Sequence, residues 1–198
     1  FFAHDLSATY LDILKDRLYT GKADGLKRRS GQTVLYKILQ ALCGLMAPVA
    51  SFLAEETYSY IPGERKESVF LTDFPVADKQ WSDARLAQDF GMLLEVRAAA
   101  SKEMEELRRQ KVIGASLDAK ITIQAPESTR KVLEAYAPYL REFFIVSQLE
   151  IKSAPGEVKV EAEKADGIKC ERCWHYDLQT GANAKFPGVC PKCIEALT

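Results

Sequence analysis

Four cysteines near the end of the chain constrain its fold more than any other feature. They form two Cys-x-x-Cys pairs, Cys170 with Cys173 and Cys190 with Cys193, and sixteen residues separate the pairs. Two residues between the thiols of a pair let one tight turn direct both sulfurs at the same metal ion. Two such pairs at this spacing predict a tetrahedral zinc site with four thiolate ligands.

A redox pair and a set of disulfides are the alternative interpretations of these cysteines. Redox Cys-x-x-Cys pairs lie on a strand-to-helix turn and do not come doubled at this spacing. Aliphatic and aromatic residues are few between Gly167 and Thr198. That segment can hardly bury a core of its own, so metal binding would supply its folding free energy.

The predicted zinc is structural rather than catalytic. Four thiolates leave no open position on the metal for an activated water. His175, two residues after Cys173, is the only competitor for a ligand position. A complete set of four thiolates gives it no role in coordination. The fifth cysteine, Cys43, lies among apolar residues and is expected to be a small buried side chain.

Composition is ordinary for a globular protein that functions in water. The chain has 198 residues, of which 47% are hydrophobic and 28% charged, enough for one large or two to three small units. No apolar run reaches membrane-spanning length, and no signal segment opens the chain. Cysteines in a metal-type arrangement fit a reducing compartment, so we expect a cytoplasmic protein. Because the chain begins with Phe1, we expect it to be a piece of a longer protein.

Apolar residues at helical spacing dominate the first half of the chain and predict a mainly α fold. The predicted helices span residues 5–20, about 30–47, 49–61 and 82–111. The first three are expected to pack together in an antiparallel helical bundle. Composition changes after Gly114, where alternating residues predict a strand over 119–125, followed by a helix and two more strands.

These patterns divide the chain into three predicted domains. A helical domain covers residues 1–113, a small α+β element covers 114–165, and the zinc-binding domain covers 166–198. None of the three carries a set of residues typical of an enzyme. The two histidines, His4 and His175, lie far apart in sequence, and no glycine-rich phosphate loop is present. We therefore expect no catalytic residues in this chain.

Basic residues gather near the first predicted helix, although the net charge of the chain is −1. Seven basic residues against two acidic ones lie between Lys15 and Lys37, a local excess of five positive charges. Side chains there could converge on a phosphate backbone. A solvated loop explains the same charges equally well.

Aromatic residues follow the first cysteine pair directly. Trp174 and His175 come after Cys173, and Arg172 precedes it. A flat ring held beside a rigid metal site offers a stacking surface to an unpaired base, which contributes about 1–3 kcal/mol per base. The alternative is that Trp174 covers the small core around the metal.

Several segments together resemble a known family. The segment HDLSATYLDILKDRLY resembles the opening of a class I anticodon-binding helical domain, and TVLYKILQALCGLMAPVASFLAEETY is similar to its next two helices. The segments KCERCWHY and VCPKC resemble the terminal zinc-binding domain of bacterial isoleucyl-tRNA synthetases, which is related to the zinc finger of formamidopyrimidine-type DNA glycosylases. The likeness covers essentially the full length of the chain and corresponds to the C-terminal part of these synthetases.

The resemblance implies a parent protein that activates isoleucine with ATP and esterifies it to its cognate tRNA. The HIGH and KMSKS signatures of that chemistry do not occur here. ATP is thus expected to be used by the parent and not bound by this chain. The chain is expected to bind the anticodon stem and loop of the isoleucine tRNA and to contact the catalytic body of the same, monomeric polypeptide, with no membrane partner.

The resemblance also assigns residues. The four cysteines correspond to the ligands of one zinc ion. The expected RNA contacts are Lys15, Arg17, Arg28, Arg29, Arg172, Trp174 and His175. Two other hypotheses stay open on the residues alone. A zinc-ribbon module that binds a partner protein, without RNA recognition, would leave the basic loop solvated. An independent zinc enzyme would require an open metal position.

Overall fold

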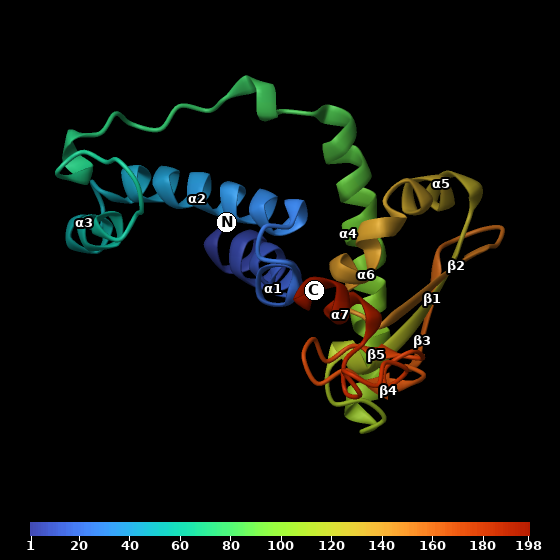
Figure 1. The fold of residues 1–198 in the computed structure, drawn as a ribbon. Coiled ribbons are helices and arrows are strands. Elements are labelled where there is room, and N and C mark those ends of the chain that lie inside the picture. Colours follow the sequence, from blue (N-terminus) through green and yellow to red (C-terminus); the bar gives the residue numbers. More distant parts are fainter. The chain divides into compact units, whose positions relative to one another are not determined.

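The computed structural model describes all 198 residues, which form two compact units. Unit 1 contains Phe1–Lys22 and Asp83–Thr198, and unit 2 contains Ala23–Ser82. Seven α-helices and five strands are present (Figure 1). The predicted fold class, mainly helical with a small α+β part and a cysteine-rich tail, is confirmed. None of the helices is both long and apolar enough to cross a membrane.

Unit 2 is built on two helices, α2 (Leu26–Met46) and α3 (Ser51–Ser59). They pack against each other around a small core that includes Cys43 and Ile61, both nearly inaccessible to solvent. The expectation that Cys43 is a buried apolar residue is confirmed. The Glu55 carboxylate of α3 accepts hydrogen bonds from Ser68 and from the backbone N–H of Val69, so the following loop is tied back to the helices.

Helix α2 begins at Leu26, about four residues earlier than predicted. Gly25 precedes it in an extended conformation, with φ −62° and ψ 136°. The basic residues Arg28 and Arg29 therefore lie in the first turn of a helix and not in a loop, which corrects the prediction. Lys, Arg and Leu are strong helix formers, and they outweigh the unfavourable Gly31 that follows them inside the helix.

In unit 1 the chain opens with a π-helix, Phe2–Leu11, that continues into α1 (Asp12–Thr20). Helix α1 packs against α6 (Ala137–Phe144) of the same unit. Its Leu14 is buried, and its Arg17 pairs with Glu142 of α6. The expectation that the first helix packs together with the next two stays a prediction, since those two helices belong to unit 2.

A three-stranded sheet forms the centre of unit 1. The strands are β1 (Ala119–Ala125), β2 (Gln148–Ser153) and β3 (Lys159–Lys164), in the order β2-β1-β3. Strand β1 runs parallel to β2 and antiparallel to β3. The chain reaches β2 from β1 through the helices α5 (Glu127–Ala135) and α6.

The long helix α4 (Ala84–Arg109) shares one hydrophobic core with this sheet. Its buried residues Leu93, Val96, Ala100 and Met104 belong to the same core cluster as Ile121 of β1, and the strand that α4 lies against is β3. The structure thus groups α4 with the element that follows it in the sequence. The division of the chain into three domains at residues 113 and 165 stays a prediction.

The end of the chain adds two short strands and a helix. The strands β4 (Ile168–Lys169) and β5 (Tyr176–Asp177) pair antiparallel, and α7 (Pro191–Leu197) closes the chain. This segment is attached to the rest of unit 1 by hydrogen bonds. The Lys169 ammonium contacts the buried Asp118 carboxylate at 3.0 Å, and the Tyr176 backbone N–H donates to the Ser147 hydroxyl at 2.7 Å.

Candidate metal centre and nucleic-acid interface

The first cysteine pair lies in the turn between β4 and β5. The backbone N–H of Cys170 donates to the carbonyl of His175 at 2.8 Å, and the N–H of Trp174 donates back to the carbonyl of Cys170 at 2.9 Å. Trp174 has a φ of 66°, a left-handed conformation that a bulky residue rarely adopts. Such strained residues persist only where the surroundings impose them, and they gather at functional sites.

The second pair lies at the start of α7. Cys190 directly precedes the helix, Pro191 occupies its first position, and Cys193 lies in its first turn. The backbone N–H of Cys190 donates to the sulfur of Cys170 at 3.3 Å, so the two pairs already contact each other through the backbone.

The four sulfurs form one cluster. All lie within 4.8 Å of one another, and the sulfurs of Cys173 and Cys190 are 3.6 Å apart. A tetrahedral site with Zn–S bonds of about 2.3 Å has sulfurs about 3.8 Å apart, whereas a disulfide bond is about 2.05 Å long. The four side chains are at most 5% exposed. The arrangement fits a structural zinc ion with four thiolate ligands and fits neither disulfides nor an open catalytic site.

The pKa values of these thiols differ because their surroundings differ. Burial raises the pKa of Cys170, but backbone N–H groups of Cys173, Cys190 and Arg172 point at its sulfur and bring its pKa down to about 6. Burial raises the pKa of Cys190 to about 11. Burial also raises the pKa of Cys173, and the nearby sulfurs of Cys193 and Cys190 raise it further. A zinc ion would offset this crowding of negative charge when bound.

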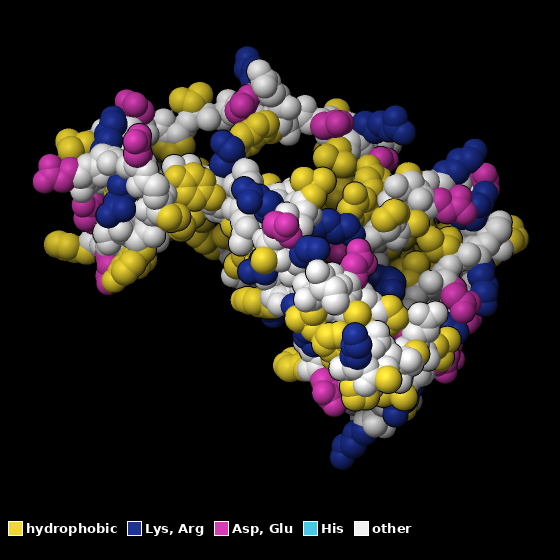
Figure 2. Space-filling view, in the orientation of Figure 1, with side chains coloured by type: hydrophobic (Ala, Val, Ile, Leu, Met, Phe, Trp, Pro, Cys, Tyr) yellow, Lys and Arg dark blue, Asp and Glu magenta, His cyan; other side chains and the backbone are white.

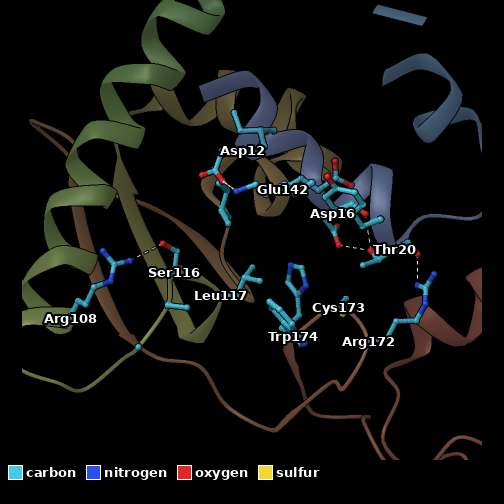
Figure 3. Close-up of a pocket in the computed structure, with 17 residues that line it drawn as sticks. Asp12, Asp16, Thr20, Arg108, Ser116, Leu117, Glu142, Arg172, Cys173 and Trp174 are labelled. Carbon is cyan, nitrogen blue, oxygen red and sulfur yellow. Dashed lines mark hydrogen bonds and ion pairs between the residues drawn. The ribbon is translucent and has the colours of Figure 1, made fainter. Parts of the chain in front are cut away.

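A pocket of about 750 Å³ lies beside the first knuckle, which we define as Cys170–Trp174. Its walls come from α1, the end of α4, the loop before β1 and the knuckle itself (Figure 3). Two exposed aromatic side chains line it, Tyr19 on α1 and Trp174 on the knuckle, with exposed fractions of 75% and 63%. The predicted alternative, that Trp174 covers the metal core, does not fit a ring this exposed.

Most charged groups around this pocket are already paired inside the protein. Arg17 contacts the Glu142 carboxylate at 2.5 Å, and its guanidinium also lies 5.6 Å from the centre of the Tyr139 ring. Lys15 contacts Asp12 at 2.7 Å while remaining largely exposed. Arg172 donates one N–H to the backbone carbonyl of Thr20, at the end of α1, and the same nitrogen lies 3.5 Å from the sulfur of Cys193.

His175 lies in the pocket wall and is buried, with an exposed fraction of 5%. Its ring is not part of the sulfur cluster, and its Nδ1 has no hydrogen-bond partner. Burial lowers the pKa of the imidazole, an effect that the nearby Asp16 carboxylate partly opposes. A buried polar atom without a partner costs about 1–3 kcal/mol, so a ligand that supplied a partner would recover part of that free energy.

Comparison with known proteins decides the family. Residues 1–123, more than half of the chain, match the family described as the anticodon-binding domain of tRNA ligase. The chain belongs to this family. Residues 167–196 also match the zinc finger found in FPG and IleRS, which agrees with the position of the four sulfurs.

Curated relatives of this chain are named isoleucine–tRNA ligases. The alignment with the relative from Syntrophotalea carbinolica is 44% identical over 208 residues, and it covers 100% of this chain and 22% of that relative. That from Caldicellulosiruptor saccharolyticus is 44% identical over 197 residues, with coverages of 98% and 21%. That from Geobacter sulfurreducens is 40% identical over 203 residues, with coverages of 98% and 22%. The predicted resemblance is confirmed, and the chain spans about a fifth of the length of these relatives.

The structure brings together only part of the predicted RNA-contact set. Lys15, Arg172, Trp174 and His175 line the same pocket. Arg17 lies on α1 as well, whereas Arg28 and Arg29 lie on α2 in unit 2. On the face drawn in Figure 2, Lys and Arg side chains are mixed with acidic and apolar ones and form no uniform basic patch.

Two residues that hold this site together, Lys192 and Ser147, were not predicted as site residues. Lys192 on α7 pairs with Asp16 on α1, and 176 residues separate them. Ser147 accepts the N–H of Tyr176 and donates its own hydroxyl to the carbonyl of Leu117, which links the tail to the loop beside the pocket. Tyr19 could have been noticed, since it is an aromatic residue among the basic residues of the first helix.

Proposed function

We propose that this chain is the tRNA-binding part of an isoleucine–tRNA ligase and that it binds the anticodon stem and loop of the isoleucine tRNA. The observation that carries the proposal is the presence, in one chain, of an anticodon-binding domain and of a four-sulfur cluster that holds an exposed Trp174 next to α1. Relatives with this name match the chain from end to end.

Different residues support this function in different ways. Trp174 offers a stacking surface, and the side chains of Lys15 and Arg29 are exposed to solvent where they can meet phosphates, although Lys15 also pairs with Asp12. The guanidinium groups of Arg17 and Arg172 are used in contacts within unit 1, so we propose that they act by holding α1 and the knuckle in place. Contacts of Arg28 and His175 with RNA stay predictions.

The chemistry of the ligase is assigned to the rest of the polypeptide. We propose that ATP and isoleucine bind outside this chain, in the catalytic body of a monomeric cytoplasmic enzyme. Binding at the anticodon then serves catalysis at a distance, because it orients the acceptor end of the tRNA and contributes to discrimination between tRNAs. One zinc ion, bound by the four cysteines, contributes rigidity and no bond-making chemistry.

A binding titration tests this proposal. The zinc-loaded chain is mixed with isoleucine tRNA and, separately, with the same tRNA carrying a swapped anticodon, at several salt concentrations. The expected result is tighter binding of the cognate tRNA by about tenfold or more, with affinity rising as salt falls. Equal affinities for the two tRNAs would contradict anticodon recognition.

The alternative of a zinc-ribbon module that binds only a partner protein predicts no RNA binding even at low salt. Nothing in the fold or in the comparisons favours that alternative. The four buried sulfurs would fill every position of a tetrahedral ion and so give no support to an independent zinc enzyme.

A further inference from the structure

We propose that Arg172 and Lys192 couple the zinc site to helix α1, so that zinc binding fixes the last turn of α1 and the contacts of α1 raise the affinity for zinc. Both are positioning residues, because they act through α1 and the cysteines. The coupling goes beyond the proposed function, since it belongs to unit 1 and its metal and operates without RNA.

Each of the two cysteine loops carries a basic residue at the same position. The second residue between the cysteines is Arg172 in the loop Cys170–Cys173 and Lys192 in the loop Cys190–Cys193. Both side chains reach α1, where they contact residues that lie 152 and 176 positions away in the sequence. A zinc ion that holds both loops therefore also holds both cations against one helix.

Arg172 contacts both cysteine pairs as well as α1. Its Nη1 donates to the backbone carbonyl of Thr20 and lies 3.5 Å from the sulfur of Cys193. This nitrogen carries two hydrogens, so it can serve both acceptors at once. The backbone N–H of Arg172 points at the sulfur of Cys170. Groups that donate to metal ligands from outside the ligand set orient those ligands and raise metal affinity.

The last turn of α1 offers acceptors to these cations. The carbonyl of Thr20 is among the last carbonyls of α1, which have no partner within the helix. Asp16 accepts from Lys192 and from the Thr20 hydroxyl, so the two contacts share one network. Figure 3 shows Asp16, Thr20 and Arg172 linked in this way. Because cations are favourable at a helix C-terminus, the two loops act as the C-terminal cap of α1.

Burial makes these contacts hard to replace with water. Thr20 is 8% exposed, and the side chain of Asp16 is 15% exposed. A partly buried carboxylate that loses its cation is costly, so loosening of the loops penalises α1. The middle of α1 is held separately, because Arg17 pairs with Glu142 of α6. The response to zinc should therefore be confined to the last turn.

The zinc affinity of the full chain, measured by competition with a chromophoric chelator, tests the coupling. Asp16→Asn is the most informative variant, because Asp16 lies on α1 and is not a zinc ligand. Coupling predicts zinc binding that is weaker by about fivefold or more, with faster amide exchange at the end of α1. The charge of Asp16 alone predicts the opposite. Four thiolates carry more negative charge than one zinc ion neutralises, so removing a nearby carboxylate would then strengthen zinc binding.

A double-mutant cycle tests the pair itself. Lys192→Gln should weaken zinc binding, and combining it with Asp16→Asn should weaken binding no further than the stronger of the two single changes. Lys192→Arg keeps the cation and should retain the affinity. Arg172→Ala, which also removes the contact with the Cys193 sulfur, should weaken zinc binding by about 10- to 100-fold.

Two matched controls accompany these variants. Asp12→Asn changes another carboxylate of α1, one that pairs with Lys15 of the same helix. Lys185→Gln removes an exposed cation that lies between the two cysteine loops. Both should keep the unaltered zinc affinity, and circular dichroism confirms that every variant retains its helices.

The results separate coupling from a local effect of charge. Weaker zinc binding in Asp16→Asn together with a non-additive double variant supports the coupling. Unchanged or tighter zinc binding in Asp16→Asn overturns it. Full additivity of Asp16→Asn and Lys192→Gln overturns it too, because the two side chains would then act on the zinc site independently.

Discussion

At the residue scale, a few side chains connect parts of unit 1 that are far apart in the sequence. Arg172 joins the knuckle to the end of α1, because its guanidinium donates to the carbonyl of Thr20 and lies near the sulfur of Cys193. Sequence patterns treated this residue only as an RNA contact. Its internal bonds make it a positioning residue as well.

Arg172→Ala should therefore destabilise the chain even without RNA. Loss of a hydrogen bond from a charged group predicts a decrease of about 1.5–3 kcal/mol in the free energy of unfolding, measured by urea denaturation. Arg109→Ala is the matched control, because Arg109 is exposed and pairs only on the surface with Glu106; its effect should stay within about 0.5 kcal/mol. Equal effects of the two substitutions would show that Arg172 contributes nothing to the anchoring.

Asp118 gives the stability a dependence on pH. Burial raises the pKa of its carboxyl. Hydrogen bonds from the N–H groups of Ala115 and Gly114 and from the Lys169 ammonium lower the pKa by more, so that it lies below the usual value for an aspartate. A carboxyl with a lowered pKa in the folded state stabilises the fold above its unfolded pKa and loses that contribution as pH falls through its folded pKa.

Asp118→Asn should consequently lower stability at pH 7 and have little effect near pH 2. Urea denaturation at the two pH values measures the difference, with about 1–3 kcal/mol expected at neutral pH from the lost charged hydrogen bonds. A variant that is equally destabilised at both pH values would contradict the role assigned to the carboxylate.

At the element scale, the cysteine tail is held by metal and docked by polar contacts. Its strands have two residues each, and only Val189 packs against the four buried cysteines as an apolar neighbour. Two ion pairs attach this tail to the rest of unit 1: Lys192 of α7 pairs with Asp16 of α1, and Lys169 pairs with Asp118, which directly precedes β1. The tail therefore depends on zinc, and α1 depends partly on the tail.

Cys190→Ser should abolish zinc binding and unfold residues 166–198, because metal binding contributes about 10–16 kcal/mol in isolated zinc modules. Most helical circular dichroism should remain, since α2, α3 and α4 have cores of their own. Hydrogen exchange at the end of α1 should become faster. Cys43→Ala is the control, which should keep one zinc per chain, and loss of most of the helical signal in Cys190→Ser would contradict the separate sources of stability.

Sequence patterns predicted those elements whose residues carry a strong local signal. The alternation of AKITIQA predicted β1 at residues 119–125, and the doubled cysteine pairs predicted the sulfur cluster. The start of α2 was placed too late, although the residues Leu26–Arg29 are strong helix formers. The packing of α1 on α6 was not predicted, because tertiary contacts decide which partner a helix packs against. The pocket could not be predicted at all, since α1 and the knuckle are about 150 residues apart and meet only in the folded chain.

At the scale of the whole molecule, the chain consists of two compact units with separate hydrophobic cores. Unit 2 has the smaller core, centred on Ile61 and Cys43. Small cores contribute less to stability, so this unit should unfold first on heating. The family match covers residues 1–123, which include all of unit 2 and part of unit 1.

Ile61→Ala should accordingly destabilise unit 2 by about 2–5 kcal/mol while leaving the zinc content unchanged. Ile61 is 1% exposed, and its truncation leaves a cavity. Amide hydrogen exchange, measured at increasing temperatures, should show early loss of protection in α2 and α3 only. Simultaneous loss of protection in α4 and the sheet would mean that the two units unfold as one.

The central claim is that this chain binds the anticodon arm of a tRNA through a surface that zinc holds in shape. Hydroxyl-radical footprinting of isoleucine tRNA on the zinc-loaded chain tests it most directly. We predict protection confined to the anticodon stem and loop, with loss of protection in the loop when a chelator removes the zinc. Protection elsewhere on the tRNA, or a footprint that does not change when the zinc is removed, would contradict it.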